Sequence, residues 1–147
     1  MRSEPTRSRA LFVYGTLLFP SILERLLGRR PLGSPGTVKG YTARTMTDAT
    51  YPGMVASETD SVSGVLLEEL TTSELELLDA YEGWPYERVE IEVTLASVDR
   101  VVAFAYVVDE PHVTENLWDR EAFADRHLRA FLGSLDEGGY SAARDQV

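Results

Sequence analysis

Short apolar segments separated by turn residues divide this chain into strands and helices. An unbroken apolar run over residues 10–14, closed by Gly15, predicts a strand that is buried on both faces. Residues 88–95 alternate between polar and apolar positions, which predicts a half-buried strand, and residues 101–108 are almost wholly apolar, as in a central strand. Weaker patterns predict strands over residues 37–46, 54–57 and 62–67, and a loop over the Pro- and Gly-rich residues 31–36.

The clearest helix signals lie just after the last of these strands. Thr71 and Glu74 have the spacing of a capping box, and Leu70 with Leu75 that of a hydrophobic staple. Gly83 and then a proline end the pattern, so we predict a helix over residues 72–82.

Two more helices are predicted, and together with the strands they indicate the fold class. Pro20 begins one helix over residues 21–27, which Gly28 ends, and the other covers residues 119–132. The second places one stripe of side chains inward, namely Phe123, His127, Leu128 and Phe131. Strands outnumber helices and most connections are too short for repeated βαβ units, so we expect an α+β fold with an antiparallel or mixed sheet curled into a partial barrel.

Composition narrows the range of functions. With 147 residues, 44% of them apolar, the chain is predicted to form one domain over residues 10–135, with disordered tails at residues 1–9 and 137–147. It contains no cysteine, which excludes thiol nucleophiles, Cys-containing zinc sites and disulfide chemistry. A net charge of -10 disfavours nucleic acid and anionic membranes as partners, and the chain has no apolar run of membrane-spanning length, so we expect a cytoplasmic protein.

Glu82 occupies an unusual position on its predicted helix. At about 100° per residue, and with Leu75 at zero, Leu78 lies at about 300° and Glu82 at about 340°, between two leucines on the apolar stripe. Burial raises the pKa of a carboxyl group above its usual value of about 4.3, so this group could exchange protons near neutral pH. The alternative is that the helix unwinds before Gly83 and leaves Glu82 as a surface acid.

The turn that follows the first strand is a second candidate site. A positive φ at Gly15 would let successive backbone N–H groups converge on a carboxylate, and the helix that begins at Pro20 would add a favourable dipole end. The alternative is a plain tight turn. His112 and His127 lack a metal-ligand spacing, so no metal site is expected, and His127 is predicted to be a packed structural residue.

Several segments carry a resemblance to a known family. FVYGTL at residues 12–17, LDAYEGWPYERVEIEV at 78–93 and AFAYV at 103–107 resemble the γ-glutamylcyclotransferase-like family, and within it the plant avirulence-induced proteins and their bacterial relatives. YPGMV at residues 51–55, SGVLLEEL at 63–70 and the tail from 118 to 131 agree in the same order. The similarity covers residues 10 to 132.

The resemblance implies a fold, a reaction and a site. It implies a mixed, partly closed β-barrel flanked by helices, and release of 5-oxoproline from γ-glutamyl compounds by attack of the α-amine on the γ-carbonyl, without a cofactor. Glu82 matches the family's catalytic glutamate, the general acid and base. The residues that match its substrate loop and aromatic pocket are Tyr14, Gly15, Thr16, Leu17, Tyr86 and Tyr106. The expected partner is a small-molecule γ-glutamyl substrate, for a monomer or homodimer.

The sequence leaves several other roles open. Thr16 and neighbouring amides are candidates to stabilise an oxyanion, and Trp84 either caps the pocket or covers the core. Four glutamates are expected to be solvated strand residues: Glu68, Glu69, Glu90 and Glu92. Leu18-Phe19-Pro20 departs from the basic and polar stretch of the γ-glutamylamine-processing branch, so the amine side of the substrate does not follow. The rival hypothesis is a non-catalytic module that binds small carboxylates.

Overall fold

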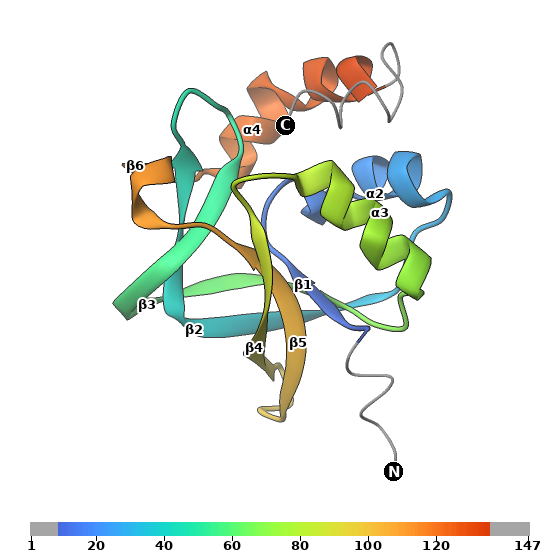
Figure 1. Ribbon diagram of the computed structural model, residues 1–147, viewed down its shortest axis with the longest axis vertical. Helices are drawn as coiled ribbons and strands as arrows, with labels where there is room; N and C mark the ends of the chain where they lie inside the picture. The colour runs from blue at the N-terminus through green and yellow to red at the C-terminus, as the bar shows by residue number, and fades with distance from the viewer. Residues whose placement is uncertain (1–8, 136–147) are drawn as a thin grey trace.

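A computed structural model of the chain describes residues 9–135 (Figure 1). The predicted tails, residues 1–9 and 137–147, lie outside this range except for residue 9. None of the described helices combines the length and the hydrophobicity that are needed to cross a bilayer.

Five strands close into a barrel, so the predicted α+β barrel fold is confirmed and its closure is more complete than expected. The strands are β1 (Leu11–Val13), β2 (Gly33–Met46), β3 (Pro52–Leu67), β4 (Glu87–Leu95) and β5 (Arg100–Val107). Antiparallel pairs join β1 to β3, β3 to β2, β2 to β4 and β4 to β5, and a parallel pairing of β5 with β1 closes the ring. The sheet is therefore mixed, and closure leaves these strands without a long free edge.

The first strand separates two regions of the core. Phe12 and Tyr14 point into the barrel and pack with small or β-branched residues of the other strands, such as Ala105 and Val93. Leu11 faces the other way, into an apolar cluster with the helices. The side chains of residues 11–13 are all buried because both faces of this strand are covered, as the unbroken apolar run predicted.

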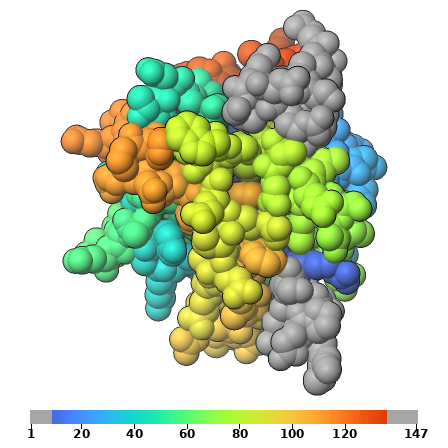
Figure 2. Space-filling model, in the orientation of Figure 1, coloured from blue at the N-terminus to red at the C-terminus, as the bar shows by residue number. Residues whose placement is uncertain are grey.

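Helices α2 (Pro20–Leu27) and α3 (Thr72–Glu82) cover one side of the barrel (Figure 1). Gly28 ends α2 at a φ of 77°, as its position predicted. Leu75 and Leu78 of α3 are buried in the same cluster as Leu11. On the surface, α3 lies beside β4, green next to yellow in the space-filling view (Figure 2).

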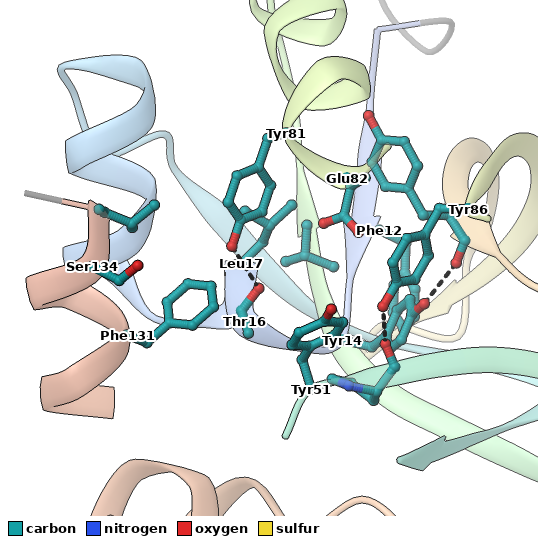
Figure 3. Close-up of a pocket in the computed structure, with 15 residues that line it drawn as sticks. Phe12, Tyr14, Thr16, Leu17, Tyr51, Tyr81, Glu82, Tyr86, Phe131 and Ser134 are labelled. Atoms are coloured by element: carbon teal, nitrogen blue, oxygen red, sulfur yellow. Dashed lines mark hydrogen bonds between the residues drawn. The ribbon is translucent and has the colours of Figure 1, made fainter. Parts of the chain in front are cut away.

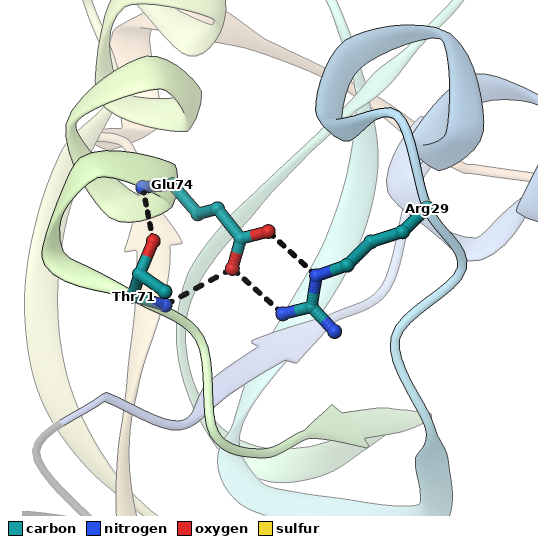
Figure 4. Close-up of polar contacts among 3 residues, drawn as sticks. All are labelled: Arg29, Thr71 and Glu74. Atoms are coloured by element: carbon teal, nitrogen blue, oxygen red, sulfur yellow. Dashed lines mark hydrogen bonds and ion pairs between the residues drawn. The ribbon is translucent and has the colours of Figure 1, made fainter.

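The N-terminus of α3 has the predicted capping box (Figure 4). The Thr71 hydroxyl accepts from the Glu74 amide at 3.0 Å, and the Glu74 carboxylate accepts from the Thr71 amide at 3.0 Å. Arg29 donates to both oxygens of the same carboxylate at 2.7 Å, across 45 positions of sequence. Leu70 and Leu75 of the predicted staple are both buried. Local sequence therefore fixes where this helix begins.

Two predictions about β2 and β3 are wrong. The loop expected over residues 31–36 is mostly strand, because β2 begins at Gly33 and pairs with β3 through backbone bonds that need no apolar pattern. A Cβ at Gly33 would lie 2.4 Å from a Val65 methyl group, so the strands approach closely. The break expected between residues 57 and 62 is an irregularity within one long strand, where the register shifts opposite residues 39–41.

The C-terminal region also differs from its prediction. A short strand β6 (Val113–Leu117), which the sequence analysis missed, pairs with the end of β2. The helix expected over residues 119–132 is interrupted: α4 (Arg120–Arg126) ends at His127, and residues 128–135 form a further helical segment. Asp119 caps α4 by accepting from the amide of residue 122 at 3.0 Å. The break turns the following segment toward the end of α3 and the turn after β1, where it lines the cavity described below.

Candidate active site

A cavity of about 170 Å³ lies where β1, the beginning of β3, the end of α3 and the last helical segment meet (Figure 3). The structure brings every residue proposed for the site to its lining: Tyr14, Gly15, Thr16, Leu17, Glu82, Tyr86 and Tyr106. These positions are separated by up to 92 residues in the chain, so the barrel and α3 together create this site. Most of the remaining lining is aromatic or aliphatic, as is usual for a small-molecule site.

Glu82 is the last residue of α3, and its carboxyl group faces the cavity (Figure 3). The residue as a whole is half-buried and lines the cavity. Burial raises the pKa of Glu82 to about 8, and the negative charge of Asp79 adds to this effect. Within residues 9–135 no hydrogen-bond donor is paired with this carboxyl group. Near neutral pH it can therefore both accept and donate a proton.

Asp79 connects α3 to the barrel one turn before Glu82. It accepts hydrogen bonds from Arg88 Nε at 2.8 Å and Arg88 Nη2 at 3.1 Å, and from the Tyr106 hydroxyl at 2.7 Å. The Arg88 guanidinium also lies over the ring of Phe104, 4.4 Å from its centroid. This network fixes the end of α3 against β4 and β5, and so fixes the direction of Glu82.

Tyr14 links β1 to two other strands at the floor of the cavity. Its hydroxyl donates to the Tyr106 carbonyl at 2.7 Å and accepts from the Met54 amide at 3.0 Å. Burial raises the pKa of Tyr14 well above its usual value, and the nearby Glu82 raises it further. Tyr14 therefore keeps its proton and positions the strands.

Gly15 is required for a different reason from the one expected. Its φ is −124°, so the predicted positive φ is wrong. A Cβ at this position would lie 2.7 Å from Cγ of Pro52, which any larger residue would have to displace. Pro52 is itself held, because its carbonyl accepts from the Tyr86 hydroxyl at 2.5 Å. The glycine lets the chain pass close to the beginning of β3.

The chain after Gly15 forms a short 3-10 turn, η1 (Thr16–Leu18), and not a plain loop. The turn's own bonds are donated by the amides of Leu18 and Phe19, at 2.9 and 3.2 Å. The turn does not use the amides of Thr16 and Leu17, and both of these residues line the cavity. Amides at such a turn are suited to bind a carboxylate. The Thr16 hydroxyl already pairs with the Tyr81 hydroxyl at 3.2 Å.

Several lining residues were not assigned from the sequence. Tyr81 precedes Glu82 on α3, and Tyr51 belongs to the YPGMV segment, which was noted for its resemblance but given no role. Phe131, Ser134 and Leu135 come from the helical segment after the break at His127. The only available signal for Tyr51 was its membership of a matching segment. The others depend on how the helices pack.

Trp84 plays neither of the roles considered for it. Its side chain is 77% exposed, is absent from the cavity lining, and packs edge-to-face on His112 with ring centroids 5.1 Å apart. His127 is half-buried beside Phe123, at a centroid distance of 5.9 Å, which agrees with a packed structural role. In the described part of the chain, no group of three or more His, Asp or Glu residues is placed to hold a metal ion.

The four glutamates expected in solvent are all exposed, although two of them are not in strands. Glu90 and Glu92 project from β4, as the alternation predicted. Glu68 and Glu69 follow the end of β3, so their assignment to a strand is wrong.

Comparisons with a family model and with known sequences identify the same family. The family model described as "Gamma-glutamyl cyclotransferase, AIG2-like" matches residues 11–123. AIG2-like protein D from Arabidopsis thaliana is 30% identical over 133 residues, which cover 87% of each chain. Protein AIG2 C from the same plant is 30% identical over 136 residues, covering 90% of this chain and 82% of its own.

Comparison with solved structures supports the fold. A solution structure of an Arabidopsis thaliana protein, 27% identical, has a TM-score of 0.68 and covers 93% of this chain and 94% of its own. A structure titled "Gamma-glutamyl cyclotransferase" has a TM-score of 0.60 at 14% identity, over 86% of this chain and 85% of its own. At that identity the second likeness shows a shared fold alone.

Proposed function

Because the chain belongs to the γ-glutamyl cyclotransferase, AIG2-like family, we propose that it is a cyclotransferase that releases 5-oxoproline from a γ-glutamyl amine or γ-glutamyl amino acid. One observation carries the proposal: a carboxyl group with a pKa of about 8 shares a small cavity with Thr16 and Leu17, whose amides the turn itself does not use. The carboxyl group supplies proton transfer, and the amides supply a place for the substrate's α-carboxylate.

The turn residues hold the substrate's constant end. The amides of Thr16 and Leu17 bind the α-carboxylate, which requires no cationic side chain in a protein with a net charge of -10. Tyr86 and Tyr106 line the wall along which the glutamyl chain curls toward Glu82. The leaving amine then occupies the remaining space.

Glu82 transfers one proton twice. The α-amine nitrogen attacks the γ-carbonyl carbon, a new C–N bond closes the five-membered ring, and Glu82 accepts the proton that this nitrogen loses. The bond from the γ-carbon to the departing nitrogen then breaks, and Glu82 returns the proton to that nitrogen. The products are 5-oxoproline and a free amine, and Glu82 ends as it began.

Both catalytic effects have familiar magnitudes. The nucleophile and the electrophile belong to one substrate molecule. An enzyme that holds the glutamyl chain curled therefore raises the rate by an effective molarity of roughly 10⁵ to 10⁸ M. General acid–base catalysis by a positioned carboxyl group contributes about 10² to 10⁴ in rate. A pKa near the working pH makes the two proton transfers comparably easy.

The test is 5-oxoproline release from a panel of γ-glutamyl amines and γ-glutamyl amino acids. Glu82→Gln is measured beside wild type, with Glu76→Gln, an exposed acid on the same helix, as the matched control. We expect turnover of at least one panel member by wild type and the control, and loss of turnover with retained binding in Glu82→Gln. Binding without turnover across the whole panel would instead indicate a non-catalytic carboxylate-binding module.

A further inference from the structure

The hydrogen bonds of the tyrosines around the cavity distinguish one of them. Within residues 9–135, Tyr14, Tyr86 and Tyr106 each donate to an acceptor of the protein, at 2.7, 2.5 and 2.7 Å. Tyr81 is paired with the Thr16 hydroxyl. The Tyr51 hydroxyl also faces this cavity, and among the described residues no protein group accepts its proton.

The position of Tyr51 is set by its backbone and not by its hydroxyl. The residue directly precedes β3, and its carbonyl accepts from the Met46 amide at 2.9 Å. Its ring packs beside the small apolar cluster of Met46, Val55 and Val108. In Figure 3 the hydroxyl is directed into the cavity, toward the side on which Glu82 lies. An aromatic ring held by packing presents this donor at a fixed place.

The environment of Tyr51 keeps its proton in place. Burial raises the pKa of Tyr51, and the charge of the nearby Glu82 raises it further. The group is therefore a neutral hydrogen-bond donor across the range of pH in which Glu82 titrates. Tyr51 is half-buried and lines the cavity, and its hydroxyl is accessible from there, so a molecule bound in the cavity can accept its hydrogen bond.

The reaction creates a hydrogen-bond acceptor, the γ-carbonyl oxygen, to which no other group of the site has been assigned as a donor. When the α-amine attacks, negative charge develops on the γ-carbonyl oxygen, and donors placed to meet such an oxyanion are a large part of catalysis. The turn amides are assigned to the α-carboxylate, and Glu82 is occupied with the two nitrogens. The Thr16 and Tyr81 hydroxyls share one hydrogen bond at 3.2 Å, in which either can be the donor, whereas the Tyr51 hydroxyl donates to no described group.

We propose that Tyr51 is a second catalytic residue, whose hydroxyl donates a hydrogen bond to the γ-carbonyl oxygen as it becomes an oxyanion. This inference rests on the proposed cyclotransferase function. The proton stays on Tyr51 throughout, so the hydroxyl stabilises charge while Glu82 alone moves protons. Tyr51 and Glu82 therefore each end the cycle in the protonation state in which they began it.

The experiment measures 5-oxoproline release by wild type, Tyr51→Phe and Tyr41→Phe. Tyr41 lies on β2 outside this cavity, so its variant controls for the loss of any one hydroxyl. We expect Tyr51→Phe to lower kcat by about 10²-fold with little change in KM, because the donor acts on the transition state. Tyr41→Phe should retain wild-type kcat.

A third protein, with 3,5-difluorotyrosine at position 51, keeps the inference testable if Tyr51→Phe is unstable. The fluorinated hydroxyl is nearly the same size and ionises at lower pH, so kcat should fall at alkaline pH values at which wild type is still active. Wild-type kcat in Tyr51→Phe, or an unchanged pH profile in the fluorinated protein, would overturn the role of Tyr51 and leave the proposed function standing. Absence of turnover by wild type would overturn both.

Discussion

Helix α3 holds a carboxyl group at each end, and the two groups have opposite properties. At its beginning, hydrogen bonds from Arg29 lower the pKa of Glu74, which also caps the helix through Thr71. At its end, burial raises the pKa of Glu82 to about 8, with no donor of the described chain to hold its charge. The two residues are eight positions apart on one rigid element.

The comparison separates stability from function. Glu74 lies where the helix presents unpaired amides and where negative charge is favoured, so its ionised form stabilises the fold. Glu82 is buried beside Asp79 at the end of the helix, and burial first and then the charge of Asp79 make its ionised form unfavourable to the fold. Such a cost is typical of a residue kept for chemistry.

The largest expected difference between the two ends is in turnover. Glu82→Gln should lower kcat by about 10² to 10⁴-fold, because it removes the group that transfers protons. Glu74→Gln should leave kcat at the wild-type level, because this residue lies away from the cavity. Steady-state kinetics with the best panel substrate measures both, and equal losses in the two variants would contradict the separation.

The second prediction concerns stability and has the opposite sign. The folded pKa of Glu82 is above its unfolded value of about 4.3, so the native state binds the extra proton and stability falls as pH rises from about 4 to 8. Glu82→Gln should therefore be more stable than wild type at pH 8, by about 1–3 kcal/mol, and equal to it near pH 4. Urea unfolding across this range measures the difference, and a pH-independent difference would refute the cause given.

The third prediction applies the same test to Glu74. Its folded pKa is lowered, so its stabilisation is complete above the unfolded value of about 4.3 and is lost as pH falls through the folded value. Glu74→Gln should lose about 1 kcal/mol at pH 7, a typical value for a capping group with a partly exposed ion pair. Glu76→Gln is the control, and the loss should shrink on acidification in the same unfolding series.

The smallest expected effect comes from the residue that acts on Glu82 from one turn away. Asp79→Asn removes a negative charge that raises the pKa of Glu82, while Asn retains an acceptor for Tyr106. The pH at which kcat/KM reaches half its maximum should therefore move to lower values, with a smaller change in the maximum. A profile that keeps its wild-type midpoint would assign Asp79 a purely structural role.

Local patterns predicted most of the helices and strands. The capping box gave the start of α3 at the correct residue, and the alternation of residues 88–95 gave β4 to within one residue. Predictions failed where pairing or packing overrides pattern. The beginning of β2 has no apolar alternation because backbone bonds to β3 hold it, and the helix near residue 127 breaks within a continuous apolar stripe.

For the site, helical periodicity placed Glu82 on an apolar stripe with a surface position as the alternative, and the resemblance supplied the other lining residues that were named. Neither the periodicity nor the resemblance indicated Tyr51 as a donor. Only the hydrogen bonds of the folded chain show which tyrosine hydroxyls already donate to a protein acceptor. The reason given for Gly15 was wrong, since a close neighbour can demand glycine as strongly as a turn does.

By itself the sequence determined the order and type of the main elements, the place of Glu82 on the apolar stripe of its helix, and the family, because helix caps, periodicity and motifs act over short stretches of chain. Only the tertiary structure decided that β1 and β5 close the barrel, that Pro52 presses on Gly15, and that Tyr51 faces the same cavity as Glu82. These relations join residues far apart in the chain. They depend on which surfaces pack together, which no local pattern encodes.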